Sequence, residues 1–146
     1  MPHQPFHYRT IEDLASDLDE LGIELPFQKD SSPLAQPVRI GDLVAPNRLA
    51  VPPMEGCDGT LEGRPDTLTT RRYLRFAAGG AGLLWFEATA IAPEARANPR
   101  QLLLTQDTVD AFARLRKAAL AEGRRVNGAD YRPFTVIQLA HSGRYS

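Results

Sequence analysis

The feature that most restricts the fold is an alternation of apolar, strand-like runs with amphipathic helical segments. Residues 82–91 and 134–141 are nearly continuous apolar runs, which are typical of strands buried on both faces. A shorter strand-like stretch, residues 47–51, precedes them. Residues 67–78 and 106–122 carry apolar side chains at helical spacing. The order strand, helix, strand, helix, strand predicts a parallel sheet with right-handed crossovers.

Two folds commonly use this order, the open doubly wound sheet and the (β/α)8 barrel. Neither crossover contains a G-x-G-x-x-G motif, which counts against a dinucleotide-binding sheet. Polar residues gather directly after the three strand-like runs, at residues 54–55, 87–88 and 138–144. In a barrel, the carboxyl ends of the strands form the face on which chemistry takes place. The sequence therefore favours an α/β fold of the TIM-barrel type.

The residues before this region predict a helix and a hairpin. Thr10 is a suitable N-cap for a helix that Gly22 would end. A polar, proline-flanked connector covers residues 26–37. Residues 38–45 resemble a small β-hairpin with Gly41 and Asp42 as its two-residue turn.

The composition limits what the chain can bind. A formal net charge of −1 gives no general electrostatic reason to expect a nucleic acid or an anionic membrane as partner. No apolar run reaches the roughly 20 residues of a membrane-spanning helix, and the first residues do not resemble a secretory signal. A single cysteine can form neither an internal disulfide nor a structural metal site by itself. We therefore expect a cytoplasmic protein without a metal site of its own.

Four segments, in order, resemble the Old Yellow Enzyme family of NADH:flavin oxidoreductases, which includes 2,4-dienoyl-CoA reductase. They read PVRIGDLVAPNRLAVPPM, RRYLRFAAGGAGLLWFEATAIAPEAR, DAFARLRKAA and VIQLAHSGRYS. The resemblance implies that residues 36–146 form about three β/α units, the N-terminal portion of an FMN-binding TIM (β/α)8 barrel, opening with the short hairpin. Residues 1–35 would be a helical arm that precedes this incomplete domain.

The same resemblance implies flavin-binding roles for five residues. Pro52, Pro53 and Met54 would line the flavin, and Ala88 would present its backbone N–H near the pyrimidine ring. Gln138 would hydrogen-bond that ring, because its amide supplies the donor and the acceptor that the ring edge needs. The alternative for Gln138 is a side chain that only satisfies a neighbouring backbone group.

Glu55 departs from the family pattern. In much of the family this position holds a Cys, Thr or His that touches the flavin. We hypothesise that Glu55 approaches the reactive edge of the flavin, where an ionised carboxylate would disfavour reduction. Cys57 is expected to be an ordinary loop thiol, because nothing nearby in the sequence clearly lowers its pKa. No catalytic acid can be assigned.

Four other residues have plainer interpretations. Glu87, in an apolar strand, is expected to be either paired or neutral, and to be a structural carboxylate and not a catalyst. Trp85 is expected to lie in the core. His141 and Arg144 follow the third strand, where they could contact cofactor or substrate or only brace a loop.

The resemblance implies an enzyme that takes hydride from NAD(P)H onto flavin N5 and passes it to an activated alkene, either an enoate or an enoyl thioester. One branch of the family also carries a 4Fe–4S cluster. The phosphate site, substrate anchors and proton donor come from later strands, and a complete barrel takes about 250 residues. We therefore expect an N-terminal fragment that binds FMN weakly by itself. The alternative is a non-catalytic remnant, or a half-barrel interaction module that a second chain completes.

Overall fold

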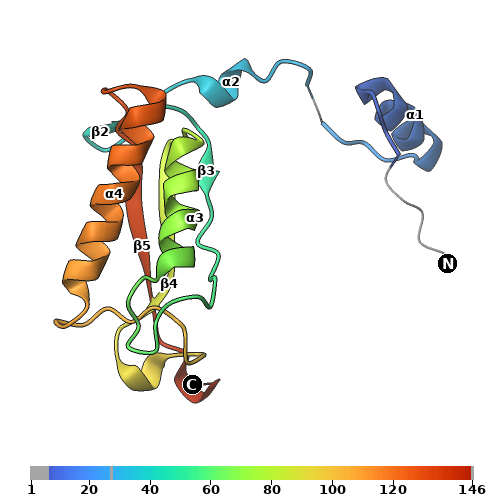
Figure 1. Cartoon of the computed structure of the whole chain (residues 1–146). Helices are drawn as coiled ribbons and strands as arrows, with labels where there is room; N and C mark the ends of the chain where they lie inside the picture. Colours follow the sequence, from blue (N-terminus) through green and yellow to red (C-terminus); the bar gives the residue numbers. More distant parts are fainter. Residues whose placement is uncertain (1–6, 27, 146) are drawn as a thin grey trace. The chain divides into compact units, whose positions relative to one another are not determined.

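Two compact units make up the chain, residues 1–33 and residues 34–146. The computed structural model in Figure 1 describes residues 7–26 and 28–145. The predicted outer limits of the two domains, residues 1 and 146, lie outside the described residues. No helix within these described ranges is long and apolar enough to cross a membrane.

The first unit contains helix α1, Ile11–Leu21, as predicted. The Thr10 hydroxyl accepts a hydrogen bond from the Asp13 backbone N–H at 3.2 Å. The Asp13 carboxylate accepts from the Thr10 N–H at 3.0 Å, which completes a capping box. Gly22 ends the helix in the left-handed conformation, with φ of +63°. These contacts are local, so α1 can form without a core, and none of its residues is buried.

The second unit opens with the short helix α2, Ser32–Ala35, and the predicted hairpin. Strands β1, Val38–Ile40, and β2, Leu43–Ala45, pair antiparallel. Gly41 lies in the turn with φ of +60°, a conformation that a two-residue hairpin turn requires and that glycine adopts without strain.

Three parallel strands form the main sheet, in the order β3–β4–β5. They are β3, Ala50–Val51, β4, Leu83–Ala90, and β5, Phe134–Ala140. The parallel order confirms the prediction, but β3 is shorter than expected. The predicted strand residues 47–49 lie before β3. There the Asn47 side chain accepts hydrogen bonds from the N–H groups of Leu49 and Gly82 at 3.0 and 2.7 Å.

Two helices, α3 and α4, connect the strands and cover one face of the sheet (Figure 1). Helix α3, Thr67–Ala78, has its predicted bounds, and α4 spans Val109–Asn127. Tyr73 of α3 stacks on Phe86 of β4 with ring centroids 4.3 Å apart. The residues buried in this core are Tyr73, Ala77, Ala81, Leu84, Phe86, Leu115 and Ala119. Two 3₁₀ turns, η1 at Pro93–Ala95 and η2 at Gly143–Tyr145, lie in the loops.

The end of α4 differs from the prediction. The sequence predicts a helix over residues 106–122, but α4 continues to Asn127, so Gly123 lies inside the helix and is buried. A Cβ at this position would lie 2.4 Å from Cε1 of Tyr131 and 3.3 Å from the carbonyl oxygen of Ala77. Tyr131 in turn donates to the carbonyl oxygen of Ala81 at 2.7 Å. The glycine is therefore a packing requirement between α3, α4 and the loop before β5, and does not stop the helix.

Trp85 does not lie in the core, contrary to the prediction. Side chains alternate along β4, so Leu84 and Phe86 face the helices while Trp85 points to the opposite face. Trp85 pairs with Val136 of β5, and each is 38% exposed. We refer to this second face, with Leu83, Trp85, Val136 and Gln138, as the open face. No element within residues 34–145 covers it.

Candidate functional site

The loops that follow β3, β4 and β5 gather at one end of the sheet, the lower end in Figure 1. This follows from the topology, because parallel strands place their carboxyl ends at the same edge. Met54 lies just after β3, Ala88 lies near the end of β4, and Gln138 lies near the end of β5. The structure therefore brings residues from three separate parts of the sequence to one edge.

A β-bulge makes two of these residues direct neighbours. The register of β4 and β5 shifts between Phe86 and Thr89. The shift leaves Glu87 and Ala88 opposite the single residue Gln138. Bulges of this kind are frequent beside active sites, where they redirect a side chain or interrupt strand pairing.

Gln138 and Met54 present side chains that a bound molecule could contact. The Gln138 side chain is exposed, and no residue in the described part of the chain hydrogen-bonds to its amide. The alternative role, satisfying a neighbouring backbone group, is therefore not observed. Met54 is 70% exposed. Its backbone N–H donates to the Pro52 carbonyl at 2.9 Å, which turns the chain sharply around Pro53.

These residues fit a flavin ring in their chemistry. The prolines and the methionine would offer apolar surface to the ring face, and Gln138 would offer an amide to the polar edge. This chemical match concerns the flavin ring and no other part of the cofactor. His141 and Arg144 are exposed, and Nδ1 of His141 accepts from the Gly143 N–H at 3.0 Å, which braces its own turn.

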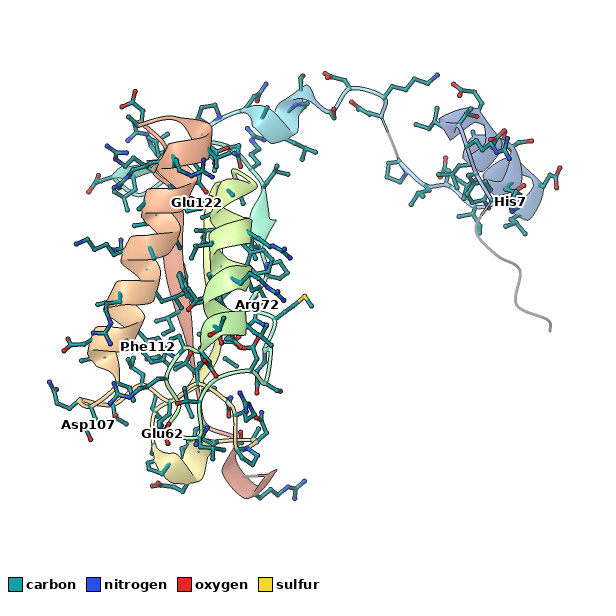
Figure 2. All side chains as sticks on the ribbon, viewed as in Figure 1. His7, Glu62, Arg72, Asp107, Phe112 and Glu122 are labelled. Carbon is teal, nitrogen blue, oxygen red and sulfur yellow. The ribbon has the colours of Figure 1, made fainter. Side chains whose placement is uncertain are left out.

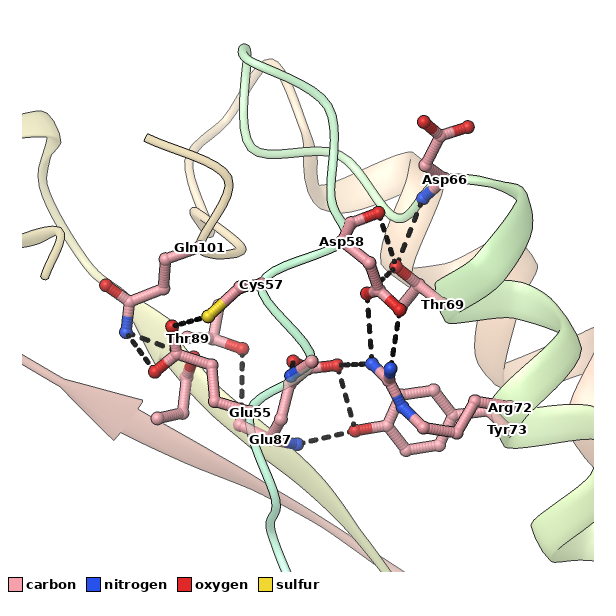
Figure 3. A network of polar contacts seen from close by, with 12 residues as sticks. Glu55, Cys57, Asp58, Asp66, Thr69, Arg72, Tyr73, Glu87, Thr89 and Gln101 are labelled. Atoms are coloured by element: carbon pink, nitrogen blue, oxygen red, sulfur yellow. Dashed lines mark hydrogen bonds and ion pairs between the residues drawn. The ribbon is translucent and has the colours of Figure 1, made fainter. Parts of the chain in front are cut away.

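Glu87 lies behind this edge and is fully buried, with 1% exposure. Figure 3 shows its contacts. Its Oε2 accepts from the Gly56 N–H at 2.6 Å, and its Oε1 accepts from Nη2 of Arg72 at 2.5 Å. Its backbone N–H donates to the Tyr73 hydroxyl at 2.7 Å. Of the two states expected for this carboxylate, paired or neutral, the structure shows the paired one.

Arg72 carries a second ion pair, to Asp58, and the two form a network that the sequence analysis missed. Nη1 and Nη2 of Arg72 lie 2.5 and 3.1 Å from the two Asp58 oxygens. Thr69 donates to the same carboxylate at 2.7 Å. Figure 2 shows Arg72 on the side of α3 that faces the loop after β3. The sequence feature that could have indicated this network is Glu87, because a charged carboxylate in a buried strand requires a cation nearby.

The pKa values of the two carboxyl groups in this network are shifted in opposite directions. Burial raises the pKa of Glu87 above its ordinary value, even though Gly56 and Arg72 stabilise the charged form. Burial also acts on Asp58, but hydrogen bonds from Arg72 and Thr69 outweigh it and lower the pKa of Asp58. Asp58 is therefore the firmly ionised partner of the guanidinium.

Glu55 points toward the loop after β4, where two side-chain amides hold it. Asn98 donates to Oε1, and Nε2 of Gln101 donates to Oε2 at 3.3 Å. The Cys57 thiol also donates to Oε1 at 3.5 Å. Desolvation, followed by the Glu55 carboxylate, raises the pKa of the Cys57 thiol, which argues against a nucleophilic thiolate.

Gln101 is a second buried residue that the sequence analysis missed, with 2% exposure. Its Nε2 also lies 3.3 Å from the Ala88 carbonyl, and its Oε1 accepts from the Ala97 N–H at 2.6 Å. Gln101 thus links the bulge in β4 to Glu55 in the loop after β3. Nothing in its loop sequence distinguishes it, because its burial depends on how two loops meet.

Comparison with known proteins agrees with this geometry. No protein-family model matches the chain. The NADPH dehydrogenases of Bacillus velezensis and Bacillus subtilis are each 30% identical to it over 115 residues, which is 76% of this chain and 31% of either relative. The structure of morphinone reductase in complex with tetrahydroNAD aligns with 77% of this chain and 28% of its own, at 29% identity and a TM-score of 0.58. The chain is a relative of the Old Yellow Enzymes.

The fold agrees with that of an Old Yellow Enzyme from a Pichia species, which aligns at a TM-score of 0.66 and 23% identity. That alignment covers 78% of this chain and 28% of the Pichia chain. The chain spans 31% of the length of the two curated relatives. It therefore corresponds to under a third of an Old Yellow Enzyme-type protein.

A 4Fe–4S cluster, which one branch of the family carries, gains no support from these residues. Within the described part of the chain, no group of three or more His, Cys, Asp or Glu could hold a metal ion. Cys57 is the single cysteine of the sequence. A cluster would need ligands from outside this Old Yellow Enzyme-like segment.

Proposed function

We propose that the chain supplies about three β/α units, the N-terminal portion of a TIM barrel that binds FMN and reduces activated alkenes with NAD(P)H. Residues 36–146 would be the barrel portion, and residues 1–35 a helical arm. The observation that carries the proposal is the bulge that sets Ala88 opposite Gln138 at the carboxyl edge of the sheet. The NADPH dehydrogenase relatives support the redox chemistry. The single cysteine is consistent with a cytoplasmic location.

In this proposal the residues at the strand ends bind the flavin ring. Pro52, Pro53 and Met54 would contact its face, while the Ala88 N–H and the Gln138 amide would bind its polar edge. When bound, FMN would supply hydride transfer between NAD(P)H and the alkene. These residues would orient the ring and stabilise charge on it.

Glu55 would adjust the electronic properties of the flavin. Amide donors from Asn98 and Gln101 hold its carboxylate in place. A negative charge near the ring disfavours its reduction. Replacing Glu55 with glutamine should therefore raise the reduction potential of bound flavin.

The substrate would be an alkene conjugated to a carbonyl, either an enoate or an enoyl thioester. Substrate anchors, the proton donor and the phosphate site would come from the remainder of a barrel, because the chain spans only 31% of its curated relatives. That remainder would be further residues of the same polypeptide or a second chain.

The test is FMN binding to the chain by equilibrium dialysis at millimolar FMN. We expect weak binding that Gln138→Leu reduces about tenfold, since it leaves the ring edge without a partner. Gln106→Leu, an exposed glutamine in the loop before α4, is the matched control and should bind as the wild type does. Equal binding by the wild type and Gln138→Leu would contradict the proposal.

A second candidate is an interaction module without catalytic activity. It is favoured by the open face, on which Trp85 and Val136 are each 38% exposed. A partner that completed the barrel would cover these side chains. Binding of such a partner without any binding of FMN would support this candidate over the first.

A further inference from the structure

A single guanidinium connects three elements behind the carboxyl edge. Arg72 extends from α3, Asp58 belongs to the loop after β3, and Glu87 lies in the bulge of β4 (Figure 3). The Arg72 side chain is 23% exposed, against 14% for Asp58 and 1% for Glu87. The three charges are therefore largely shielded from water, where ion pairs depend strongly on having all partners present.

Gly56 is held by this network from two sides. Its N–H donates to Oε2 of Glu87 at 2.6 Å. A Cβ at this position would lie 2.0 Å from Nη1 of Arg72, so the guanidinium lies directly against the main chain. This contact explains why a glycine follows the Pro52 to Glu55 segment, and it fixes the path of the backbone that leads out of β3.

The bulge itself depends on the same residues. The Glu87 N–H donates to the Tyr73 hydroxyl at 2.7 Å, so this N–H is not available to β5. Oε1 of Glu87 meanwhile accepts from Arg72. With Glu87 held toward α3 by main chain and side chain, Ala88 becomes the second residue opposite Gln138.

We propose that Arg72 is a positioning residue, which through Glu87 and Gly56 holds both stretches of main chain that border the flavin edge. The inference rests on the proposed function for the identity of the ligand. The arrangement requires a carboxylate at position 87, because Gly56 and Arg72 donate to different oxygens. A glutamine has one acceptor oxygen, so its NH₂ group would face one of the two donors.

Three variants of the 146-residue chain test the inference. Glu87→Gln removes one acceptor, Arg72→Lys removes the forked donor, and Gly56→Ala displaces the guanidinium while leaving every charge in place. Arg71→Lys, at the exposed neighbouring arginine of α3, is the matched control. Amide hydrogen exchange and backbone chemical shifts by NMR report on Gly56 and Ala88 without FMN, and the FMN-induced shifts of the Gln138 side-chain amide report on binding.

We expect all three variants to accelerate exchange of the backbone amide of residue 56 by about tenfold or more, relative to the intrinsic rate of that residue type, since each removes or weakens a hydrogen bond to a charged group. The Ala88 amide shift should move, and the FMN dissociation constant should rise by a similar factor. Arg71→Lys should match the wild type in all three measurements. Unchanged exchange at the amide of residue 56 together with an unchanged Ala88 shift, in Gly56→Ala and in one of the other two variants, would overturn the inference.

A different result would contradict the proposed function. A wild-type chain whose Gln138 amide does not respond to FMN contradicts FMN binding, whatever the variants do. The exchange rates and shifts measured without FMN then still decide whether Arg72 positions the main chain.

Discussion

The two faces of the three-stranded sheet differ in how completely the chain covers them. On the helix-covered face, Leu84 is fully buried and Phe86 stacks on Tyr73. On the open face, directly between those two positions along β4, Trp85 is 38% exposed. The residues have similar hydrophobic character, so the difference comes from the neighbouring elements and not from the side chains.

The comparison shows which part of the structure the chain can specify alone. The crossover helices α3 and α4 follow their strands in sequence and bury one face by local connection. The open face has no such cover from residues 34–145. Gln138 lies on the open face. The β4 bulge opposite Gln138 contacts α3 through the hydrogen bond from the Glu87 N–H to the Tyr73 hydroxyl. The covered face therefore supports the candidate site on the open one.

The largest expected effect is on stability at the covered face. Leu84→Ala should lower the free energy of unfolding by about 2–5 kcal/mol, because it leaves a cavity in the core. Leu83→Ala is the matched control, since it removes the same atoms from the adjacent, half-buried position on the open face. It should cost less than about 1.5 kcal/mol. Equal losses in chemical denaturation would remove the distinction between the faces.

Gly123→Ala should give the next largest effect. Alanine is normally better than glycine inside a helix, but here its Cβ would lie 2.4 Å from Tyr131. Overpacking of this kind costs about 1–3 kcal/mol. Ala121→Gly, an exposed position in the same helix, separates helix propensity from packing. A stabilised Gly123→Ala variant would show that α3 and α4 pack more loosely than described.

Asp58 should contribute a pH-dependent effect on the acid side. Its pKa is lowered in the folded chain, so its contribution is present above the unfolded value of about 3.9 and is lost as pH falls through the folded pKa. Glu87 acts in the opposite direction, because a raised pKa favours folding at low pH. Asp58→Asn should therefore flatten the loss of stability below about pH 4.

This effect should be about 1 kcal/mol, since partial exposure weakens the ion pair. Denaturation midpoints measured from neutral to acid pH provide the test, with Asp130→Asn in the exposed loop before β5 as the control. An Asp58→Asn variant whose acid dependence parallels that of the wild type would contradict the assignment.

The smallest expected effect is at Trp85. Trp85→Phe should change stability by no more than about 0.5 kcal/mol, because most of the covered core is untouched. Acrylamide should quench the fluorescence of this single tryptophan in the folded chain, though less than in the unfolded chain, because its side chain is 38% exposed. Strong protection that disappears on dilution would mean that a second copy covers the open face.

Features determined by local sequence were predictable. The capping box at Thr10, the turn at Gly41 and the strand–helix order each depend on residues close in the chain. The exposure of Trp85 was not predictable, because an apolar strand has the same pattern whether one or both faces are covered.

The candidate site also has residues that could be predicted from the sequence and residues that could not. Ala88 and Gln138 could be selected from family motifs. Arg72, which contacts Glu87, and Gln101, which contacts the Ala88 carbonyl, could not be selected, because these contacts join elements far apart in sequence. The true end of α4 was missed for the same reason, since only Tyr131 shows why Gly123 lies inside the helix.

The most direct test of this account is an NMR titration of the chain with FMN, mapped onto the two faces. We predict that shifts concentrate at the backbone amides of residues 54–56, at Ala88 and at the Gln138 side chain, while the amides of α4 remain unchanged. Saturating FMN that leaves the strand-end residues unperturbed, or that shifts the helix-covered face instead, would contradict the assignment of this edge as the flavin site.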